Sequence, residues 1–391
     1  MTISQSAVNP LFGINNLPYG VFCPPDQDPR VGVRIGDDVI DLAQALNDDT
    51  FAHSTLNPFM TQGRGRWISV RNKVIDLIAS DRVPASALYP VADISLCLPF
   101  QVGDYVDFYA SEHHATNLGR MFRPHTPPLL PNWKHLPVGY HGRSGTIVVS
   151  GTDICRPHGQ SRSTATGCPE FGPSTRLDIE AEIGFVIGVG SSLGQPVSVD
   201  EFADHVFGAV LVNDWSARDI QAWEYAPLGP FLGKSFATSI SPWVVPLPAL
   251  EHARIPGPDQ DPQPSHYLQE TEPWSLDIDM SVVWNGQEVS RPPYGQMYWS
   301  PAQMLAHLTV NGASVRTGDL YASGTVSGPE KNQRGSFIEL TWGGVEPIAL
   351  NSGIRTFLED GDEVIIAASA PGPNNTRIGF GEVAGRIAPT P

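Results

Sequence analysis

The sequence is poor in cysteine and contains no long apolar run. Its four cysteines include no pair with CxxC spacing, so the sequence supports neither a zinc knuckle nor a thioredoxin-like redox motif. So few thiols in a chain of 391 residues fit a reducing compartment. No segment approaches the roughly 18 apolar residues of a membrane helix, and the first residues lack the basic and apolar regions of a signal peptide. We therefore expect a cytoplasmic protein with no membrane segment.

Positive charge is also scarce. The chain has 24 Lys and Arg residues against 41 Asp and Glu residues, which gives a formal net charge of −17. An acidic surface disfavours nonspecific binding to nucleic acids and to anionic membranes, so we expect neither as a partner. Solubility is the simplest consequence of this charge. An anionic substrate would need a local positive site, made by a metal ion or by a few Arg and Lys side chains.

Three common catalytic signatures are missing. HExxH does not occur, which excludes a zincin, and GxSxG does not occur, which leaves an α/β-hydrolase nucleophile unsupported. Gly233-Lys234-Ser235 is not a phosphate-binding loop, because GxxxxGK[ST] spacing needs glycine at position 228, where the chain has leucine. These absences leave carboxylates, histidines and isolated basic residues as the candidates for chemistry.

The chain does contain a core-forming share of apolar residues and many chain breakers. Hydrophobic residues make up 41%, and 38 glycines and 37 prolines are spread along the length, which favours many short strands joined by turns. Pro99 marks the expected boundary between domains at 1–100 and 101–391, and one helical pattern occurs at 67–78. Runs rich in Val, Ile and Phe predict strands at 31–35, 39–42, 146–150, 179–187, 207–212, 280–284, 337–341, 364–368 and 378–387.

Glutamates on one predicted strand are the first candidates for chemistry. Alternate residues of a strand point to the same face, so Glu180 and Glu182 share a face, and Asp178 joins them if the strand is regular. Neighbouring carboxylates repel one another unless a cation or a proton lies between them. A solvent-facing strand surface with salt-bridge partners explains this stretch about equally well, so the pattern alone leaves both interpretations open.

A second group of polar residues follows the predicted strand at 207–212. Asp214, Arg218 and Gln221 come directly after this apolar run, and the end of a buried strand is a usual place for a functional site. Farther along, Lys234 stands among Gly, Phe and Leu. Its ammonium there needs an anionic partner, unless the side chain extends to the surface.

A third group, at 104–114, contains two aspartates, two tyrosines and the adjacent histidines His113 and His114. Histidine is well suited to act as a general base near neutral pH, although most histidines are structural, and spacing does not separate these two. The candidate ligands in the three groups are carboxylates, and oxygen ligands favour Ca²⁺ or Mg²⁺ over zinc. The residues alone thus indicate a β-rich acidic enzyme with an oxygen-ligated metal, and they leave its substrate open.

Longer motifs are more specific than these groups. They are Asn15-Asn-Leu-Pro-Tyr-Gly-Val-Phe, Asp104-Tyr-Val-Asp-Phe-Tyr, His114-Ala-Thr-Asn-Leu-Gly, Pro131-Asn-Trp, Leu136-Pro-Val-Gly-Tyr-His-Gly-Arg, Asn213-Asp-Trp-Ser-Ala-Arg-Asp-Ile-Gln, Pro227-Leu-Gly-Pro-Phe-Leu-Gly-Lys-Ser-Phe and Ser323-Gly-Thr-Val-Ser-Gly. Over nearly the whole chain, from about residue 15 to about residue 387, the sequence resembles the fumarylacetoacetase family. The short DxExE pattern at 178–182 also occurs in the wider superfamily of acylpyruvate hydrolases, hydratases and decarboxylases, and so specifies less.

This resemblance implies a mainly β fold and a specific reaction. The expected architecture is a small N-terminal SH3-like barrel domain at 1–100, followed by a larger C-terminal β-sandwich roll at 101–391, in a homodimer. The implied reaction is hydrolysis of a carbon–carbon bond in 4-fumarylacetoacetate, a small diketo acid, to fumarate and acetoacetate. In the family this is the last step of tyrosine and phenylalanine catabolism.

The resemblance also implies roles for individual residues. His114, oriented by Glu339, is expected to activate water, while Arg218, Lys234 and Gln221 stabilise negative charge. The expected substrate contacts are Tyr109, Arg123, Tyr140, Gln221, Tyr225 and Thr325. The expected Ca²⁺ ligands are Asp107, Glu180, Glu182 and Asp214, and the positions associated with Mg²⁺ are Asp214, Lys234 and Thr238. An ammonium is not a metal ligand, so Lys234 would contribute its backbone carbonyl.

Two other functions remain open at this point. The same scaffold could carry out acylpyruvate hydrolysis or diene hydration, which share the short carboxylate pattern. The chain could also be a non-enzymatic, Ca²⁺-dependent β-sandwich that binds a carbohydrate or a protein. In that case His114, Glu339 and Lys234 would have no reason to converge.

Overall fold

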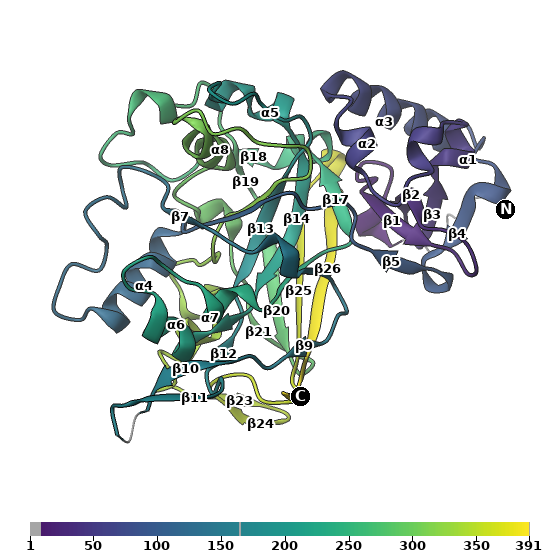
Figure 1. The fold of residues 1–391 in the computed structure, drawn as a ribbon. Helices are drawn as coiled ribbons and strands as arrows, with labels where there is room; N and C mark the ends of the chain where they lie inside the picture. The colour runs from purple at the N-terminus through teal and green to yellow at the C-terminus, as the bar shows by residue number, and fades with distance from the viewer. Residues whose placement is uncertain (1–8, 164–165, 391) are drawn as a thin grey trace.

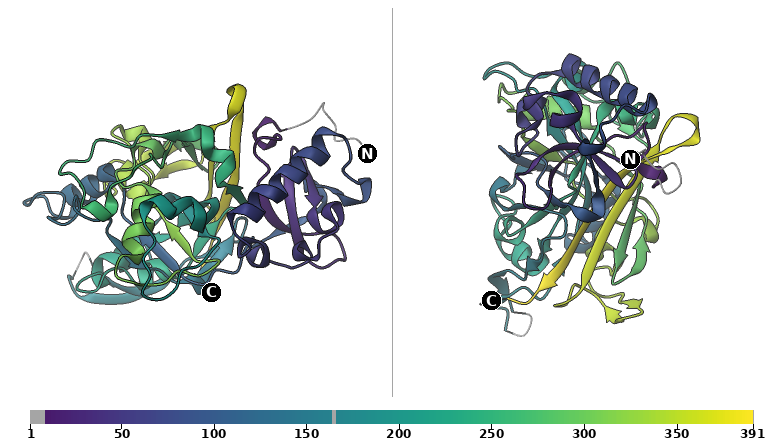
Figure 2. Two further views of the ribbon diagram at one scale, coloured as in Figure 1. Left: turned by 90° about the horizontal axis from the view of Figure 1, so that it is seen from above. Right: turned by 90° about the vertical axis from the view of Figure 1, so that its right-hand side faces the viewer.

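The computed structural model describes residues 9–163 and 166–390, and it shows a small N-terminal unit beside a larger sheet-rich body (Figure 1). Residues 1–8, which bear on the expected lack of a signal peptide, lie outside the described part. Figure 2 shows the N-terminal unit against one side of the body, with the hairpin of β25 (Glu363–Pro371) and β26 (Arg377–Ala388) running along the junction. Among the described helices, none has the length and apolar character needed to cross a bilayer.

The N-terminal unit is a small sheet packed against short helices. Its strands are β1 (Tyr19–Cys23), β2 (Arg30–Ile35), β3 (Asp38–Asp41), β4 (Leu88–Pro90) and β5 (Ser95–Cys97). Its helices are α1 (Leu42–Leu46), α2 (Asn57–Met60) and α3 (Arg64–Ala79). One face of α3 buries Trp67, Val70 and Val74 in the same apolar cluster as the strand residues. The helix predicted at 67–78 is therefore confirmed.

The expected SH3-like barrel is not confirmed, because the N-terminal sheet is open in the part of the chain that the structure describes. β1 pairs with β2 on one side. On its other side, the second half of β1 pairs with β5 and the first half with β17 (Trp243–Pro246) of the larger body. No described ladder joins β4 to β5. The edge of β1 that could close a barrel instead joins the two parts of the molecule.

The larger body consists of two packed sheets. The main sheet continues from β1 in the order β17-β14-β13-β22-β6-β7, while β16 also pairs with β14, and β8 pairs with β16. These strands are β6 (Tyr105–Phe108), β7 (Gly139–His141), β8 (Ile147–Val149), β13 (Ala181–Ile187), β14 (Val206–Asp214), β16 (Thr238–Ile240) and β22 (Leu320–Ala322). The second sheet has the order β21-β20-β25-β26-β9, with β9 (Ile154–Cys155), β20 (Asp279–Trp284) and β21 (Gln287–Ser290).

Shorter elements surround the two sheets. The described helices of the body are α4 (Glu112–Phe122), α5 (Phe202–His205), α6 (Arg218–Glu224), α7 (Leu232–Ser235), α8 (Pro301–Thr309) and α9 (Phe337–Leu340). Short strand pairs are formed by β10 (His158–Arg162) with β11 (Pro169–Pro173), β12 (Leu177–Asp178) with β15 (Ser216–Ala217), β18 (Arg254–Ile255) with β19 (Ser275–Leu276), and β23 (Ile348–Leu350) with β24 (Gly353–Arg355). In Figure 1, α4, α6 and α7 lie at the same end of the body.

The central strands β13 and β14 are buried on both faces. Ile183 and Leu211 belong to the cluster shared with the second sheet, whereas Val186 and Val212 belong to the cluster shared with the N-terminal unit. Burial on both faces explains why these strands read as nearly continuous apolar runs rather than as alternating ones. Because the two parts share a core, the domain boundary near residue 100 stays a prediction.

The mainly β class is confirmed, and so are all the predicted strands except one. Residues 337–341 were expected to form a strand, but they contain the short helix α9. A buried apolar run of this length fits a strand and a buried helix equally well, so periodicity does not distinguish them. Here tertiary hydrogen bonds to the start of α9 decide the outcome. Helices α4, α6 and α8 were also not expected.

Candidate active site and metal site

Four carboxylates meet where the central strands of the main sheet end. Asp107 lies in β6, Glu182 in β13 and Asp214 at the end of β14, while Glu180 directly precedes β13. Each offers one oxygen within 4.8 Å of the others. Two residues before Asp214, on the same face of β14, Val212 is still part of the apolar core. The carboxylate cluster thus occupies the position where the core would otherwise continue.

The oxygens of this cluster are buried and short of protein donors. Both carboxylate oxygens of Glu182 and Oδ1 of Asp107 have no hydrogen-bond partner among the described residues. Burial, followed by the neighbouring carboxylates, raises the pKa of Asp107 and of Glu182 well above the ordinary values. Buried carboxylates with unused oxygens are a suitable donor set for a hard divalent cation. The donor set therefore fits a metal site, and the alternative of a solvent-facing strand surface is excluded.

Two buried cations offset part of this negative charge. Lys234 Nζ donates to Glu180 Oε2 and, at 2.6 Å, to Asp214 Oδ2. Arg218 Nη1 lies 2.7 Å from Glu180 Oε1. Burial alone would raise the pKa of Glu180, but Lys234 and Arg218 outweigh it and hold this pKa below its ordinary value. Lys234 is itself buried, so the alternative in which its side chain extends to the surface is excluded.

Asp214 also receives hydrogen bonds from two hydroxyl groups. Thr238 Oγ1, in β16, donates to Asp214 Oδ1 at 2.9 Å, and Tyr140 OH, in β7, donates to Oδ2 at 3.0 Å. A cavity of about 490 Å³ lies against these side chains and Lys234. The positions that the family resemblance associates with Mg²⁺ are therefore neighbours in space, and Tyr140 lies beside them.

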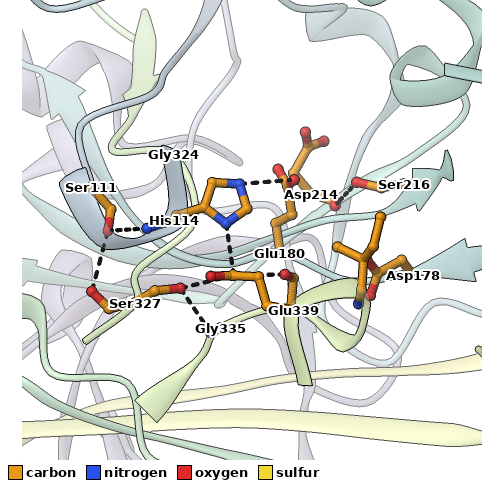
Figure 3. A network of polar contacts seen from close by, with 12 residues as sticks. Ser111, His114, Asp178, Glu180, Asp214, Ser216, Gly324, Ser327, Gly335 and Glu339 are labelled. Atoms are coloured by element: carbon orange, nitrogen blue, oxygen red, sulfur yellow. Dashed lines mark hydrogen bonds and ion pairs between the residues drawn. The ribbon is translucent and has the colours of Figure 1, made fainter. Parts of the chain in front are cut away.

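A buried histidine–glutamate pair stands next to the carboxylate cluster. His114 Nδ1 is 2.7 Å from Glu339 Oε2, and His114 Nε2 points to the cluster, 3.9 Å from Glu180 Oε1 (Figure 3). The side chain of Ser111, which caps α4, accepts a hydrogen bond from the backbone amide of His114. His113 is only half-buried and is not part of this pair. The structure thus separates two histidines that spacing alone could not, and the paired one is the histidine that the family resemblance named.

Glu339 is held by three further side chains that the sequence reasoning missed. Asn117 Nδ2 donates to Oε1 at 2.9 Å, and the hydroxyls of Ser327 and Ser336 donate to Oε2 at 2.9 and 2.8 Å. Burial would raise the pKa of Glu339, but His114 and these donors together lower it to about 2. Spacing offered a signal for two of them. Asn117 lies three residues after His114 on one helix face, and Ser336 lies three residues before Glu339.

Asp178 does not join the carboxylate cluster. The chain leaves regular strand geometry between β12 and β13, so the alternation that would place Asp178 beside Glu180 is interrupted. Its carboxylate instead accepts hydrogen bonds from Arg218 Nε at 2.7 Å and from the backbone amides of Phe337 and Ile338.

Arg218 and Gln221 lie one turn apart at the start of α6. Arg218 Nη1 donates to Gln221 Oε1 at 3.2 Å, so the two polar groups form a unit. Arg218 Nη2 is buried and has no hydrogen-bond partner in the described part of the chain. One donor of this guanidinium is therefore available to a ligand.

The other residues that were expected to contact the substrate differ in their burial and in their hydrogen-bond partners. The Tyr109 ring packs edge-on against the His114 ring, with centroids 5.2 Å apart. Thr325 Oγ1 and Arg123 Nε are buried without a partner among the described residues, while Arg123 Nη2 donates to the backbone carbonyl of Pro128. Tyr225 follows the end of α6 and is half-exposed.

The carboxylate cluster leads to a prediction about thermal stability. Asp107 and Glu182 have folded-state pKa values above their unfolded values, so metal-free protein should lose stability as pH rises from about 5 toward 8. Ca²⁺ at about 100 times its Kd adds about 2.7 kcal/mol, which corresponds to roughly 3–6 °C in Tm. Differential scanning calorimetry at several pH values, with Ca²⁺ and with chelator, measures this. If the difference in Tm between the Ca²⁺ samples and the chelator samples does not increase with pH, repulsion among the carboxylates is not the cause of the lost stability.

Comparison with known sequences identifies the class to which this fold and site belong. Residues 105–388 match the family described as the C-terminal part of fumarylacetoacetate hydrolase, and residues 15–99 match the family described as the N-terminal part of fumarylacetoacetase. The fumarylacetoacetases of Caenorhabditis elegans and Homo sapiens are each 46% identical to the chain over 404 aligned residues. These alignments cover 97% of this chain and 96% of each relative. The chain therefore belongs to the fumarylacetoacetase family and is an enzyme of the hydrolase class.

Solved structures with low sequence identity share the fold. A fumarylacetoacetate hydrolase from Exiguobacterium antarcticum superposes with a TM-score of 0.58 at 16% identity, and covers 95% of this chain and 99% of its own. A maleylpyruvate hydrolase from Sphingobium gives a TM-score of 0.55 at 14% identity, and covers 95% of this chain and 100% of its own. The mainly β architecture described above is thus shared across distant relatives.

Proposed function

We propose that the protein hydrolyses a carbon–carbon bond of 4-fumarylacetoacetate to give fumarate and acetoacetate. The observation that carries this proposal is the buried His114–Glu339 pair, which faces the carboxylate cluster in a chain 46% identical to fumarylacetoacetases. The reaction has two difficult steps. Water must attack a ketone carbon, and a carbon atom must then leave with the bonding electrons.

His114 activates water in this proposal. Its Nδ1 is tied to the Glu339 carboxylate, so the proton on that side of the ring stays on Nδ1 and Nε2 is the free base. Nε2 takes a proton from water as the oxygen bonds to the ketone carbon, and the ionised Glu339 stabilises the imidazolium that forms. The same proton is returned when the carbon–carbon bond breaks, so no other acid is required.

Arg218, Lys234 and Gln221 stabilise the negative charge that develops on the ketone oxygen. Arg218 Nη2 is the one donor of its guanidinium without a protein partner in the described residues, and it therefore suits an oxyanion. A single donor of this kind contributes about 3–4 kcal/mol to transition-state stabilisation. Gln221, held next to Arg218, supports the same oxyanion through its amide.

The remaining polar groups bind the rest of the substrate. Arg123 suits the terminal carboxylate, because a guanidinium can bind a carboxylate through two parallel hydrogen bonds. Thr325 has a buried hydroxyl without a protein partner in the described chain, and Tyr109 packs against the general base. Tyr140 lies beside Asp214, and Tyr225 is exposed enough to meet the substrate from the solvent side.

The metal site is proposed to hold Ca²⁺ through Asp107, Glu180, Glu182 and Asp214, with Mg²⁺ near Asp214, Thr238 and the backbone carbonyl of Lys234. When bound, a divalent cation supplies positive charge that stabilises the diketone oxygens as electron density accumulates on the leaving carbon. The protein contributes the rigid, water-poor carboxylate cluster that selects a hard cation. Lys234 and Arg218 balance the remaining negative charge.

The oligomeric state, the metabolic pathway and the cellular compartment of the enzyme are also part of the proposal. The family resemblance supports a homodimer and a place at the end of tyrosine and phenylalanine catabolism. Four free cysteines, two of them exposed, support a reducing compartment such as the cytoplasm. Sedimentation equilibrium of the purified protein tests the dimer.

A spectrophotometric assay with purified protein tests the function. We expect loss of 4-fumarylacetoacetate, and we expect chelator to abolish it and Ca²⁺ or Mg²⁺ to restore it. Parallel assays with an acylpyruvate and with a diene acid separate this reaction from the two chemistries that share the scaffold. Faster turnover of an acylpyruvate would replace the proposed substrate. Activity unchanged by thorough metal removal would exclude the metal role.

A further inference from the structure

We propose that Asp178 is a positioning residue that aligns the two halves of the catalytic apparatus. One half is the Arg218 guanidinium, and the other is helix α9, which carries Glu339 and through it orients His114. The proposal deepens the function above and rests on it for the activity measurements, whereas the contacts that suggest it stand on their own.

The Asp178 carboxylate uses both oxygens to join segments that are distant in sequence. Oδ2 accepts from Arg218 Nε at 2.7 Å and from the Ile338 amide at 3.1 Å. Oδ1 accepts from the Phe337 amide at 2.7 Å and from its own neighbour, the Ile179 amide, at 2.8 Å. The side chain is fully buried, so water does not compete for these bonds.

Helix α9 depends on this carboxylate at its first turn. The hydroxyl of the N-cap residue Ser336 donates to Glu339 and accepts no capping hydrogen bond from the helix. The first amides of the helix, those of Phe337 and Ile338, are satisfied by Asp178. Glu339 follows them directly, so the position of its carboxylate depends on the distance set by Asp178.

The direction of Arg218 depends on Asp178 as well. Nε is bound to Asp178 and Nη1 to Glu180, which fixes the plane of the guanidinium and leaves Nη2 as the donor without a protein partner in residues 9–163 and 166–390. A planar fork held at two nitrogens has little freedom at the third. Asp178 therefore determines where Nη2 points relative to His114.

The test is Asp178→Asn. The amide oxygen can still accept from Phe337, but the amide NH₂ that replaces Oδ2 meets the Arg218 and Ile338 donors and repels them. Misplacement of catalytic groups by about 1 Å can cost about 100-fold, so we expect kcat to fall about 10- to 100-fold with KM within about threefold. Ca²⁺ affinity should change far less than kcat, because Asp178 supplies no oxygen to the carboxylate cluster and is connected to it only through Arg218.

A double-mutant cycle separates positioning from a general loss of stability. In an Arg218→Lys background, Asp178→Asn should lower kcat less than it does in the wild-type enzyme, because the part of the loss that arises from Arg218 is already present and only the part that arises from α9 remains. The matched control is Asp219→Asn, which alters a carboxylate next to Arg218 whose hydrogen bonds are made with Ser174, Thr175 and Ile220. This control should lower Tm but leave kcat within about twofold. If the fold-losses in kcat of the two single variants simply multiply in the double variant, Asp178 does not act through Arg218, and the proposal is overturned.

Two further measurements keep the inference testable if a variant or the assay fails. Asp178→Glu retains the charge and moves the carboxylate by one methylene group. It should lower kcat at least about fivefold, and wild-type kcat in this variant would contradict the proposal. The crystal structure of Asp178→Asn should show displacement of Arg218 and of the first turn of α9. Unchanged positions of both would reject the positioning role whatever the substrate, whereas an inactive wild-type enzyme would reject only the proposed reaction.

Discussion

Replacing His114 with alanine is expected to lower kcat about 1000-fold or more, with the fold and metal affinity retained. A positioned general base contributes about 10²- to 10⁴-fold, and this imidazole lies between its orienting carboxylate and the metal cluster. Glu339 keeps three other hydrogen-bond donors in the variant, so its buried charge is not left unpaired. Single-turnover and steady-state assays with 4-fumarylacetoacetate measure the loss, and calorimetry measures Ca²⁺ affinity.

The adjacent histidine provides a matched control for this experiment. His113→Ala removes an imidazole from the same helix turn, but from a half-buried position outside the His114–Glu339 pair. We expect its kcat to stay within about twofold of wild type, since surface substitutions away from a site usually have small effects. Full turnover by His114→Ala, or an equal loss in His113→Ala, would remove His114 from the role of base.

Replacing Glu182 with glutamine is expected to have opposite effects on metal binding and on the stability of the metal-free protein. Glu182 is fully buried, and neither of its oxygens has a partner in the described protein, so its charge is compensated chiefly by a cation. Loss of that charge should weaken Ca²⁺ binding about 100-fold, which is about 2.7 kcal/mol. Without metal, the variant should be more stable than wild type at pH 8, because one of the mutually repelling carboxylates is gone.

Isothermal titration calorimetry and thermal unfolding with chelator measure these two effects in one sample set. Asp219→Asn serves again as the control, because it removes a carboxylate outside the cluster and should leave Ca²⁺ affinity unchanged. Unchanged Ca²⁺ affinity in Glu182→Gln would count against the ligand assignment. A metal-free variant that is less stable than wild type would show that Glu182 has a protein partner.

Local patterns were reliable where the backbone is regular. The alternation correctly brought Glu180 and Glu182 to one cluster, because Glu180 directly precedes β13 and residues two apart along a strand point to the same side. Asp178 was expected to join them only if the strand were regular, and the strand breaks between β12 and β13. Because of that break, the Asp178 carboxylate binds Arg218 and α9 instead of joining the metal cluster.

The segment at 337–341 shows a second limit of local reasoning. Phe337, Ile338 and Leu340 are all buried, so the pattern of apolar residues shows neither the period of a helix nor that of a strand. Asp178, 159 residues earlier in the chain, provides the hydrogen bonds that favour the helix. The choice between His113 and His114 was likewise made by a partner 225 residues away from His114.

By itself, the sequence determined the β-rich class, the carboxylates that share a strand face, and the family, because composition, alternation and long motifs are properties of the chain alone. The family resemblance named the four acids and the His114–Glu339 pair in advance, but only the tertiary structure showed that they meet at one site and that the N-terminal sheet stays open in the described part of the chain. These outcomes depend on contacts between segments far apart in the chain. Such contacts follow from how sheets and helices pack, and no local period encodes them.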